Sequence, residues 1–108
     1  MELNAYQTAA QNTRNKELSE REEILNYALG LGECGEAQNK IKKLMFHGHD
    51  ESEIVPEIID ELGDILWYIA TLSKLFGYTL ENVASINLEK LRNRYPEGFN
   101  PDGSINRR

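Results

Sequence analysis

Apolar residues recur along almost the whole chain at intervals of three and four positions, which is the spacing of one face of an α-helix. No stretch alternates apolar and polar residues for long enough to indicate a β-strand. The pattern predicts four helices, over residues 4–15, 19–46, 52–76 and 80–94, the third beginning at Ser52 or Val55 and the fourth after Thr79. We therefore expect an all-α protein in which these helices form a four-helix bundle.

The residues between the helical segments are of the kinds that start and stop helices. Ser19 followed by Glu22 has the spacing of a capping box, which satisfies free backbone N–H groups at a helix start. Gly77 suits a helix end, where a positive φ is common, and Pro96 stops the last helix because proline lacks a backbone N–H. Residues 97–108 are rich in glycine, proline and asparagine and are expected to form an irregular tail.

The segment 52–76 is apolar on nearly every side in its second half, and one apolar stripe runs along its whole length. The stripe consists of Val55, Ile58, Ile59, Leu62, Ile65, Leu66, Ile69, Leu72 and Phe76. A helix of this kind is normally buried nearly all round, and a chain of 108 residues offers few other helices to cover it. We expect a homo-oligomer that buries this helix between subunits.

Length and charge limit the classes of function. The 108 residues fit a single domain, and the net charge is −6. This charge argues against nucleic acid and against an anionic membrane surface as partners, and it means that a phosphate ligand needs metal cations to bind. The longest apolar run, residues 65–72, is too short to cross a bilayer. The lone cysteine and the absence of a visible signal peptide fit a cytoplasmic protein.

Two pairs of acidic residues lie inside predicted helices. Glu33 with Glu36, and Glu61 with Asp64, are each three residues apart, so each pair lies on one helical face. Counted from the short loop at 47–50, the two pairs fall at similar heights of an antiparallel hairpin. Four carboxylates in one small volume repel one another unless cations lie between them. Hard divalent ions prefer oxygen ligands, so we expect Mg²⁺ first and Mn²⁺ second.

Glycines accompany both acidic pairs. Gly32, Gly35 and Gly63 weaken helix interiors, and we interpret them as making room beside the acids for another helix or a ligand. The alternative is that the acids form an ordinary solvated face, in which Glu36 pairs with Lys40 one turn later. Glycines beside the acids on both helices favour the metal site over this alternative.

These motifs resemble a known family. The segments GECGE (residues 32–36) and DELGD (60–64) are similar to the metal-binding signature of the MazG-like, all-α nucleoside triphosphate pyrophosphohydrolases. The segment NLEKLRNRYPEGF (87–99) resembles the closing segment of that family, and KIKKLMFHG and GDILWYIA are similar to its short, single-domain members. The resemblance covers about residues 20–99 and extends the prediction to one MazG-like domain over residues 1–108.

The resemblance implies Mg²⁺-dependent hydrolysis of a nucleoside triphosphate between its α and β phosphates, giving the monophosphate and pyrophosphate. It also implies a homodimer, or a tetramer built from two dimers. The acidic pairs would be the catalytic metal ligands, and three residues of the last helix would contact the substrate or its phosphates. The ligands are Glu33, Glu36, Glu61 and Asp64, and the substrate contacts are Asn87, Lys90 and Arg94.

Two features bear on the details of such a site. Gly32 stands where the family pattern E-E-x-x-E has its first glutamate, so if that glutamate activates water in relatives, a remaining carboxylate or a metal-bound hydroxide has to do so here. Two aromatic residues follow Asp64 by about one turn, and either ring could stack on a nucleotide base. Trp67 is expected chiefly in an interface core, whereas Tyr68 is the better candidate for contact with substrate.

Other functions are compatible with parts of the pattern. A regulatory or interaction module that binds metal or nucleotide without catalysis is the alternative that the absent first glutamate supports. A ferritin-like di-iron bundle is disfavoured because neither histidine follows a glutamate by three residues. The pattern leaves open which base or sugar is preferred. It also leaves open whether the role is house-cleaning of damaged nucleotides, limiting a signalling nucleotide, or serving a phage.

Overall fold

The computed structural model describes residues 1–32, 34–46, 48 and 50–105. The regular elements in these ranges are helices and no β-strand forms, which confirms the predicted all-α class. In chain order they are α1 (Leu3–Ala10), the 3₁₀-helix η1 (Gln11–Thr13), α2 (Glu20–Leu31), α3 (Cys34–Phe46), α4 (Glu51–Leu75), α5 (Leu80–Arg94) and α6 (Pro101–Ile105). None of these described helices is long and apolar enough to span a membrane.

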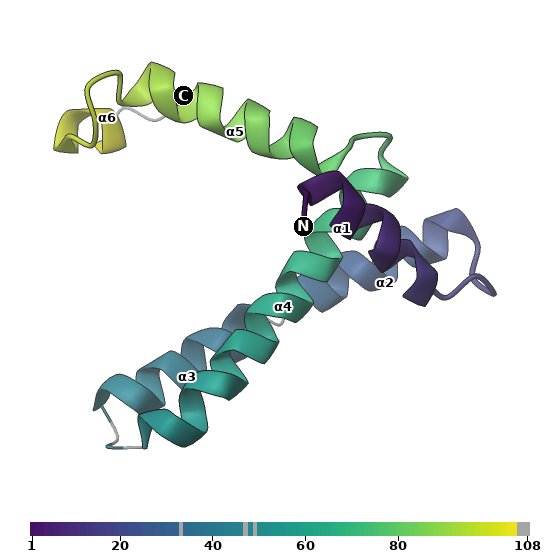
Figure 1. The fold of residues 1–108 in the computed structure, drawn as a ribbon, viewed down its shortest axis with the longest axis horizontal. Coiled ribbons are helices and arrows are strands. Elements are labelled where there is room, and N and C mark those ends of the chain that lie inside the picture. The colour runs from purple at the N-terminus through teal and green to yellow at the C-terminus, as the bar shows by residue number, and fades with distance from the viewer. Residues whose placement is uncertain (33, 47, 49, 106–108) are drawn as a thin grey trace.

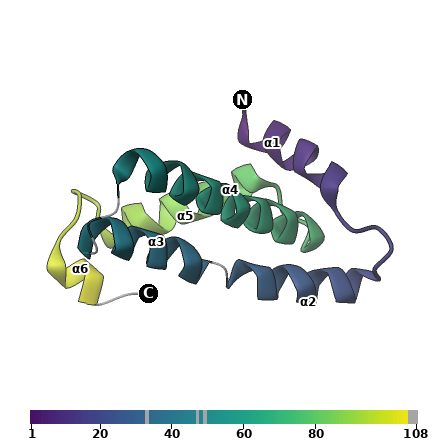
Figure 2. The ribbon, with the colours of Figure 1, turned by 90° about the horizontal axis from the view of Figure 1, so that it is seen from below.

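The central helix of the fold is α4 (Figure 1). Helices α2 and α3 follow one another nearly in line and lie side by side with α4, α3 against its first half and α2 against its second (Figure 2). Helix α1 packs across the end of α4, while α5 begins near that end and diverges from the α3–α4 hairpin (Figure 1). The α3–α4 hairpin and the α5–α6 segment therefore form two diverging arms.

Side-chain caps define the starts of three helices. The Ser19 hydroxyl accepts a hydrogen bond from the Glu22 N–H while the Glu22 carboxylate accepts one from the Ser19 N–H, so the predicted capping box is confirmed. Thr79 forms the same kind of box at α5. At α4 the cap is Asp50, which accepts from the Ser52 N–H at 2.9 Å. This helix therefore begins slightly earlier than the sequence predicts.

The predicted single helix over residues 19–46 is wrong, because α2 ends before Gly32 and α3 begins after it. Around the break the backbone hydrogen bonds span three residues instead of four, from Gly32 N to the Leu29 carbonyl at 3.1 Å and from Gly35 N to the Gly32 carbonyl at 3.2 Å. Glycine supports a helix less well than any residue except proline. Glycines at three nearby positions, residues 30, 32 and 35, explain why the rod is interrupted here.

Buried polar contacts attach α1 to the rest of the fold. The Gln7 amide, in a residue only 4% exposed, donates to the carbonyls of Ala70 and Tyr78 at 3.0 Å. Its oxygen accepts from the Leu80 N–H at 2.9 Å. One side chain thus satisfies backbone groups at the end of α4 and at the start of α5, where buried polar atoms need partners.

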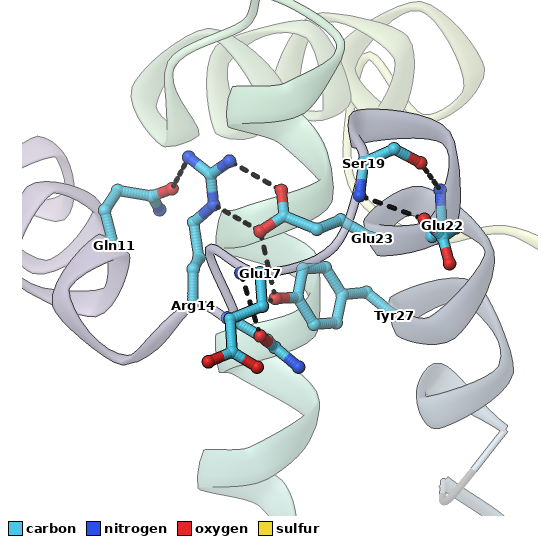
Figure 3. Close-up of polar contacts among 8 residues, drawn as sticks. Gln11, Arg14, Glu17, Ser19, Glu22, Glu23 and Tyr27 are labelled. Atoms are coloured by element: carbon cyan, nitrogen blue, oxygen red, sulfur yellow. Dashed lines mark hydrogen bonds and ion pairs between the residues drawn. The ribbon is translucent and has the colours of Figure 1, made fainter.

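A second polar cluster joins the segment after η1 to α2 (Figure 3). The Arg14 guanidinium donates to both carboxylate oxygens of Glu23, at 3.3 and 2.6 Å. The Tyr27 hydroxyl donates to the same carboxylate at 3.5 Å. Glu23 is only 2% exposed. The hydrogen bond between the Glu23 carboxylate and the Arg14 guanidinium is the main cause of the raised pKa of Arg14. A carboxylate so removed from water depends on these partners.

A single chain does not form the compact four-helix bundle that the sequence predicts. Its radius of gyration is 16.8 Å, whereas a compact chain of this length has about 13 Å. Helix α5 packs on α1 and α4 near its own start, and the rest of it extends away from the body (Figure 1). The extended shape leaves several helix faces without a neighbour.

The first half of α4 has one such uncovered face. Ile54 and Ile58 are buried beneath α3, but another row of apolar side chains is exposed. These are Val55, Ile59, Leu62 and Leu66, with exposed fractions of 40, 60, 46 and 39%. The predicted all-round burial of this helix is therefore absent within one chain.

The tail is more regular than predicted, because residues 101–105 form α6. The Asn100 side chain accepts a hydrogen bond from the Gly103 N–H at 2.6 Å, as a cap does. A Cβ at Gly103 would lie 2.6 Å from the Arg94 carbonyl, so glycine allows α6 to pack against the end of α5. The rings of Tyr95 and Phe99, 5.3 Å apart, stabilise the connecting turn.

Candidate functional site

Lys40 shows how α3 faces α4. Its ammonium group lies 3.4 Å from the Glu57 carboxylate and 4.0 Å from that of Glu61. Because the two helices are antiparallel, one turn back along α3 corresponds to one turn forward along α4. Glu36, one turn before Lys40 on the same face, therefore lies at the level of the turn that carries Glu61 and Asp64.

The described acids do not form a complete metal site by themselves. Glu36 and Asp64 are exposed, and the Glu61 side chain is 16% exposed. Within the described ranges no group of three or more acidic, histidine or cysteine side chains lies close enough together to hold an ion. Glu33, the fourth predicted ligand, lies outside these ranges. The donor type still suits Mg²⁺, which takes carboxylate oxygens.

The glycines beside the acids differ from the prediction. A Cβ added at Gly35 or at Gly63 would meet no atom within 4 Å, so no other helix of the same chain approaches at these positions. At Gly30, in contrast, a Cβ would overlap the ring of Tyr68. Near the predicted acids, Gly30 therefore makes room within the chain, and the group it admits is an aromatic side chain.

Asp64 lies at the edge of a small aromatic pocket of about 300 Å³, which it lines with Thr13, Trp67 and Tyr68. The Trp67 indole N–H donates to the Thr13 hydroxyl at 2.8 Å and to the Ala10 carbonyl at 3.2 Å. The Trp67 and Tyr68 rings meet edge to face, 5.4 Å apart. Trp67 thus packs within its own chain, whereas the sequence suggests a core between subunits.

A larger pocket of about 760 Å³ lies between α5 and α6. Lys90 and Arg94, one turn apart on α5, both line it. The Nε atom of Arg94 is buried and has no hydrogen-bond partner among the described residues. Asn87 is exposed on the same helix but does not line the pocket. The other lining residues are Ile86, Glu89, Asn93, Asn100, Asp102 and Gly103.

The predicted site residues thus fall into two sets on different arms. The acids of α3 and α4 share one arm with Trp67 and Tyr68, and the basic residues Lys90 and Arg94 lie on the other. Figure 1 shows these arms diverging. The structure places Asp64 beside Trp67 and Tyr68 in one pocket and Lys90 beside Arg94 in another, but it does not bring these two sets together within one chain.

Some residues of these sites are missed by reasoning from the sequence. Lys40 is predicted only as a partner of Glu36 along the helix, whereas its described ion pairs cross to α4. Its position one turn after Glu36 is the signal that places it near the acids. Thr13 lies near the end of the predicted helix over residues 4–15 and Asn100 lies in the predicted irregular tail, and no spacing rule connects either residue to a pocket.

Fold and site together define an all-α protein with acidic residues on two adjoining helices of a hairpin. Residues 20–99 match the family described as the MazG nucleotide pyrophosphohydrolase domain, and the chain therefore belongs to this family. It is also similar to the Gene 37 protein of Mycobacterium phage L5, with 31% identity over 117 residues that cover 99% of this chain and 100% of the relative. No solved structure matches the chain. The resemblance seen in the motifs is confirmed, and the family indicates a nucleotide pyrophosphohydrolase.

Proposed function

We propose that this protein hydrolyses nucleoside triphosphates between the α and β phosphates, with Mg²⁺ as the cofactor and Mn²⁺ as a substitute. The observation that carries the proposal is the register of the hairpin, in which Lys40 lies against Glu61 and one turn from Glu36. Membership of the pyrophosphohydrolase family supports the same reaction. The products are the nucleoside monophosphate and pyrophosphate.

The carboxylates suit a hard divalent cation. Glu36, Glu61 and Asp64, with Glu33 from outside the described residues, would hold Mg²⁺ through oxygen atoms. When bound, Mg²⁺ neutralises phosphate charge and lowers the pKa of water. This help matters because the chain has a net charge of −6 and a triphosphate is strongly anionic.

The chain's own residues bind and orient the nucleotide in this proposal. Trp67 and Tyr68 present aromatic surface beside Asp64, on which a base can stack. Lys90 and Arg94 contact phosphate oxygens through charge-assisted hydrogen bonds. Lys40, whose side chain is 27% exposed, offsets part of the repulsion among the acids when no cation is present.

We also propose that the working form is a homodimer or a tetramer of two dimers. The exposed apolar row on α4, from Val55 to Leu66, supports this assembly. Apolar surface of this kind, gathered on one helix face, marks an interface more often than free surface.

The test of the activity is pyrophosphate release from each common ribo- and deoxyribonucleoside triphosphate, and from oxidised and methylated ones, with Mg²⁺, with Mn²⁺ and with a chelator. Glu36→Gln and Asp64→Asn should keep the helical circular dichroism signal and lose roughly 100-fold or more of the activity, since even second-sphere partners of metal ligands cost about 10–100-fold. Asp60→Asn, which changes a neighbouring exposed acid, should keep the activity.

A binding module without catalysis is the second candidate. The observation that favours it is Gly32, which replaces the first glutamate of the family pattern. If the wild-type chain binds a nucleotide in a Mg²⁺-dependent manner by calorimetry but releases pyrophosphate from none, this candidate replaces the first.

A further inference from the structure

Thr13, the last residue of η1, lines the aromatic pocket with a hydroxyl whose hydrogen is already used. Thr13 Oγ1 donates to the Ala10 carbonyl at 3.0 Å and accepts from the Trp67 indole N–H at 2.8 Å. A hydroxyl has one hydrogen and two lone pairs, so these two contacts leave one lone pair. Toward a molecule in the pocket, the Thr13 hydroxyl can therefore accept a hydrogen bond but has no second hydrogen to donate.

The other side chains of the pocket add to this acceptor character. Trp67 carries the one side-chain N–H among the described lining residues, and that N–H is directed at the Thr13 hydroxyl and the Ala10 carbonyl. The Asp64 carboxylate accepts only, and in the proposed function its oxygens bind the metal. Thr13 is therefore the polar group that is left to contact the edge of a base stacked on the rings.

Contacts on the C-terminal side of Thr13 hold it in place (Figure 3). Arg14, the next residue, forms an ion pair at 2.6 Å with Glu23, which is only 2% exposed. One residue further, the Asn15 backbone N–H donates to the Tyr27 hydroxyl at 3.0 Å. Both contacts attach this segment to α2, so the position of the Thr13 hydroxyl is set before a ligand binds, which lowers the cost of recognition.

Nucleobases differ in the group that they present to an acceptor of this kind. Cytosine carries an amino group at position 4 and adenine carries one at position 6, and both amino groups donate hydrogen bonds. Uracil, thymine, guanine and hypoxanthine carry a carbonyl oxygen at the corresponding position, and this oxygen only accepts. Two acceptors that face each other form no hydrogen bond. Stacking does not separate the two groups of bases, because every base has a π face.

We propose that Thr13 is a specificity-determining residue, which selects nucleotides with an exocyclic amino group on the base over nucleotides with an oxo group at the same position. The base stacks on Trp67 and Tyr68, and its amino group donates to Thr13 Oγ1. This inference rests on the proposed function and narrows its substrates to cytosine and adenine nucleotides.

The first test compares kcat/KM within matched pairs of substrates in the presence of Mg²⁺. The pairs are dCTP with dUTP and dATP with dITP, in which an amino group is exchanged for an oxo group. Wild type should favour the amino member of each pair by roughly 3- to 10-fold, the contribution of one hydrogen bond. Thr13→Val keeps the shape of the side chain and removes the acceptor, so both ratios should fall to about 1 or below. Thr13→Ser keeps the hydroxyl and should keep the preference.

The matched control for this test is Thr8→Val. The Thr8 hydroxyl likewise donates to a backbone carbonyl one turn earlier, that of Asn4 at 3.0 Å, but Thr8 does not line the pocket. This variant should keep the wild-type ratios. Wild type without a preference for the amino members, or a preference that Thr13→Val leaves unchanged, overturns the proposal.

The second test measures binding without turnover. Trp67 is the single tryptophan of the chain, so its fluorescence reports on a molecule in the pocket that it lines. The probes are the α,β-imido analogues of dCTP and dUTP, whose bridging nitrogen resists hydrolysis. With Mg²⁺ present, the dCTP analogue should change the fluorescence at a concentration roughly 3- to 10-fold lower than the dUTP analogue. Thr13→Val should remove this difference. Fluorescence that neither analogue changes contradicts the assignment of the pocket to the base.

The two tests separate failure of this inference from failure of the proposed function. Wild-type chain that releases no pyrophosphate, yet binds the dCTP analogue more tightly through Thr13, refutes the function and supports the selection of the base. Active wild-type chain whose substrate ratios do not respond to Thr13→Val supports the function and refutes the selection.

Discussion

At the level of single residues, Gly30 lacks the side chain that would overlap the ring of Tyr68. We expect Gly30→Ala to destabilise the fold by about 1–2 kcal/mol, because overpacking costs about 1–3 kcal/mol and the gain in helix propensity returns up to about 1 kcal/mol. The matched control is Gly63→Ala, where the added Cβ meets open space and should stabilise the fold by about 0.5–1 kcal/mol. Urea unfolding at one chain concentration measures both. Equal effects of the two substitutions would show that Tyr68 moves aside freely.

The Arg14–Glu23 pair gives a second prediction at this level. Arg14→Met leaves the buried Glu23 carboxylate without its cation, and we expect the free energy of unfolding to fall by about 3 kcal/mol. In the double variant Arg14→Met/Glu23→Met no charge remains to be desolvated, so the loss should be smaller than in the single variant. Urea unfolding measures both losses. A double variant as unstable as the single one contradicts this explanation.

Spacing predicts which residues carry the chemistry but not which residues they meet. Three-residue intervals on predicted helices select Glu36, Glu61 and Asp64 as candidate metal ligands. The contacts of Lys40 with Glu61, and of Gly30 with Tyr68, depend on how α4 packs against α2 and α3. That packing involves residues far apart in the chain, and no local pattern encodes its register.

At the level of helices, the starts are predicted better than the interruptions. A cap is local chemistry, so Ser19 is recognised with its Glu22 partner. The break at Gly32 is not recognised from the sequence, because each glycine costs a helix only about 1 kcal/mol. Packing on α4 decides whether the helix continues. Helix α6 escapes prediction for a related reason. A helix of 5 residues does not form alone, and its support comes from the end of α5.

The cap of α4 makes the stability of this helix depend on pH. Hydrogen bonds from the Ser52 backbone N–H and then from its hydroxyl lower the pKa of Asp50 from its ordinary 3.8. The N–H of Ser19 likewise lowers the pKa of Glu22 from 4.5. A carboxyl with a lowered pKa in the fold stabilises it above the unfolded pKa, and this stabilisation is lost as the pH falls through the folded pKa.

We therefore expect Asp50→Asn, which keeps an N-capping side chain but does not titrate there, to lose less stability on acidification than wild type. Thermal unfolding at a series of pH values from about 6 down to about 3 measures the difference. Asp60→Asn, in the interior of the same helix, is the control for removing one exposed acid. If the two variants respond to acid alike, the cap is not the cause.

At the level of the whole molecule, the features that the sequence places in one bundle are distributed over two arms. The apolar pattern of α4 predicts a helix that is covered on more than one side, and a single chain covers only part of it. Periodicity shows how much surface must be buried and is silent on which chain buries it. The radius of gyration of 16.8 Å and the exposed row on α4 agree with this partial cover of the helix.

We expect the proposed homo-oligomer to depend on the exposed row of α4. Ile59 and Leu66 are 60 and 39% exposed within one chain, and the double variant Ile59→Glu/Leu66→Glu places two carboxylates where apolar contact is expected. Burying unpaired charges is costly, so the dissociation constant of the assembly should rise by roughly 100-fold or more, which corresponds to about 2.8 kcal/mol. Light scattering over a dilution series measures this change.

The control is Lys74→Glu, which alters the net charge by the same amount at an exposed polar position of α4 and should leave the assembly intact. Small-angle scattering of the dissociated variant should give a radius of gyration near the 16.8 Å of the single chain. A variant that keeps the mass of the wild-type assembly would show that α4 does not form the interface.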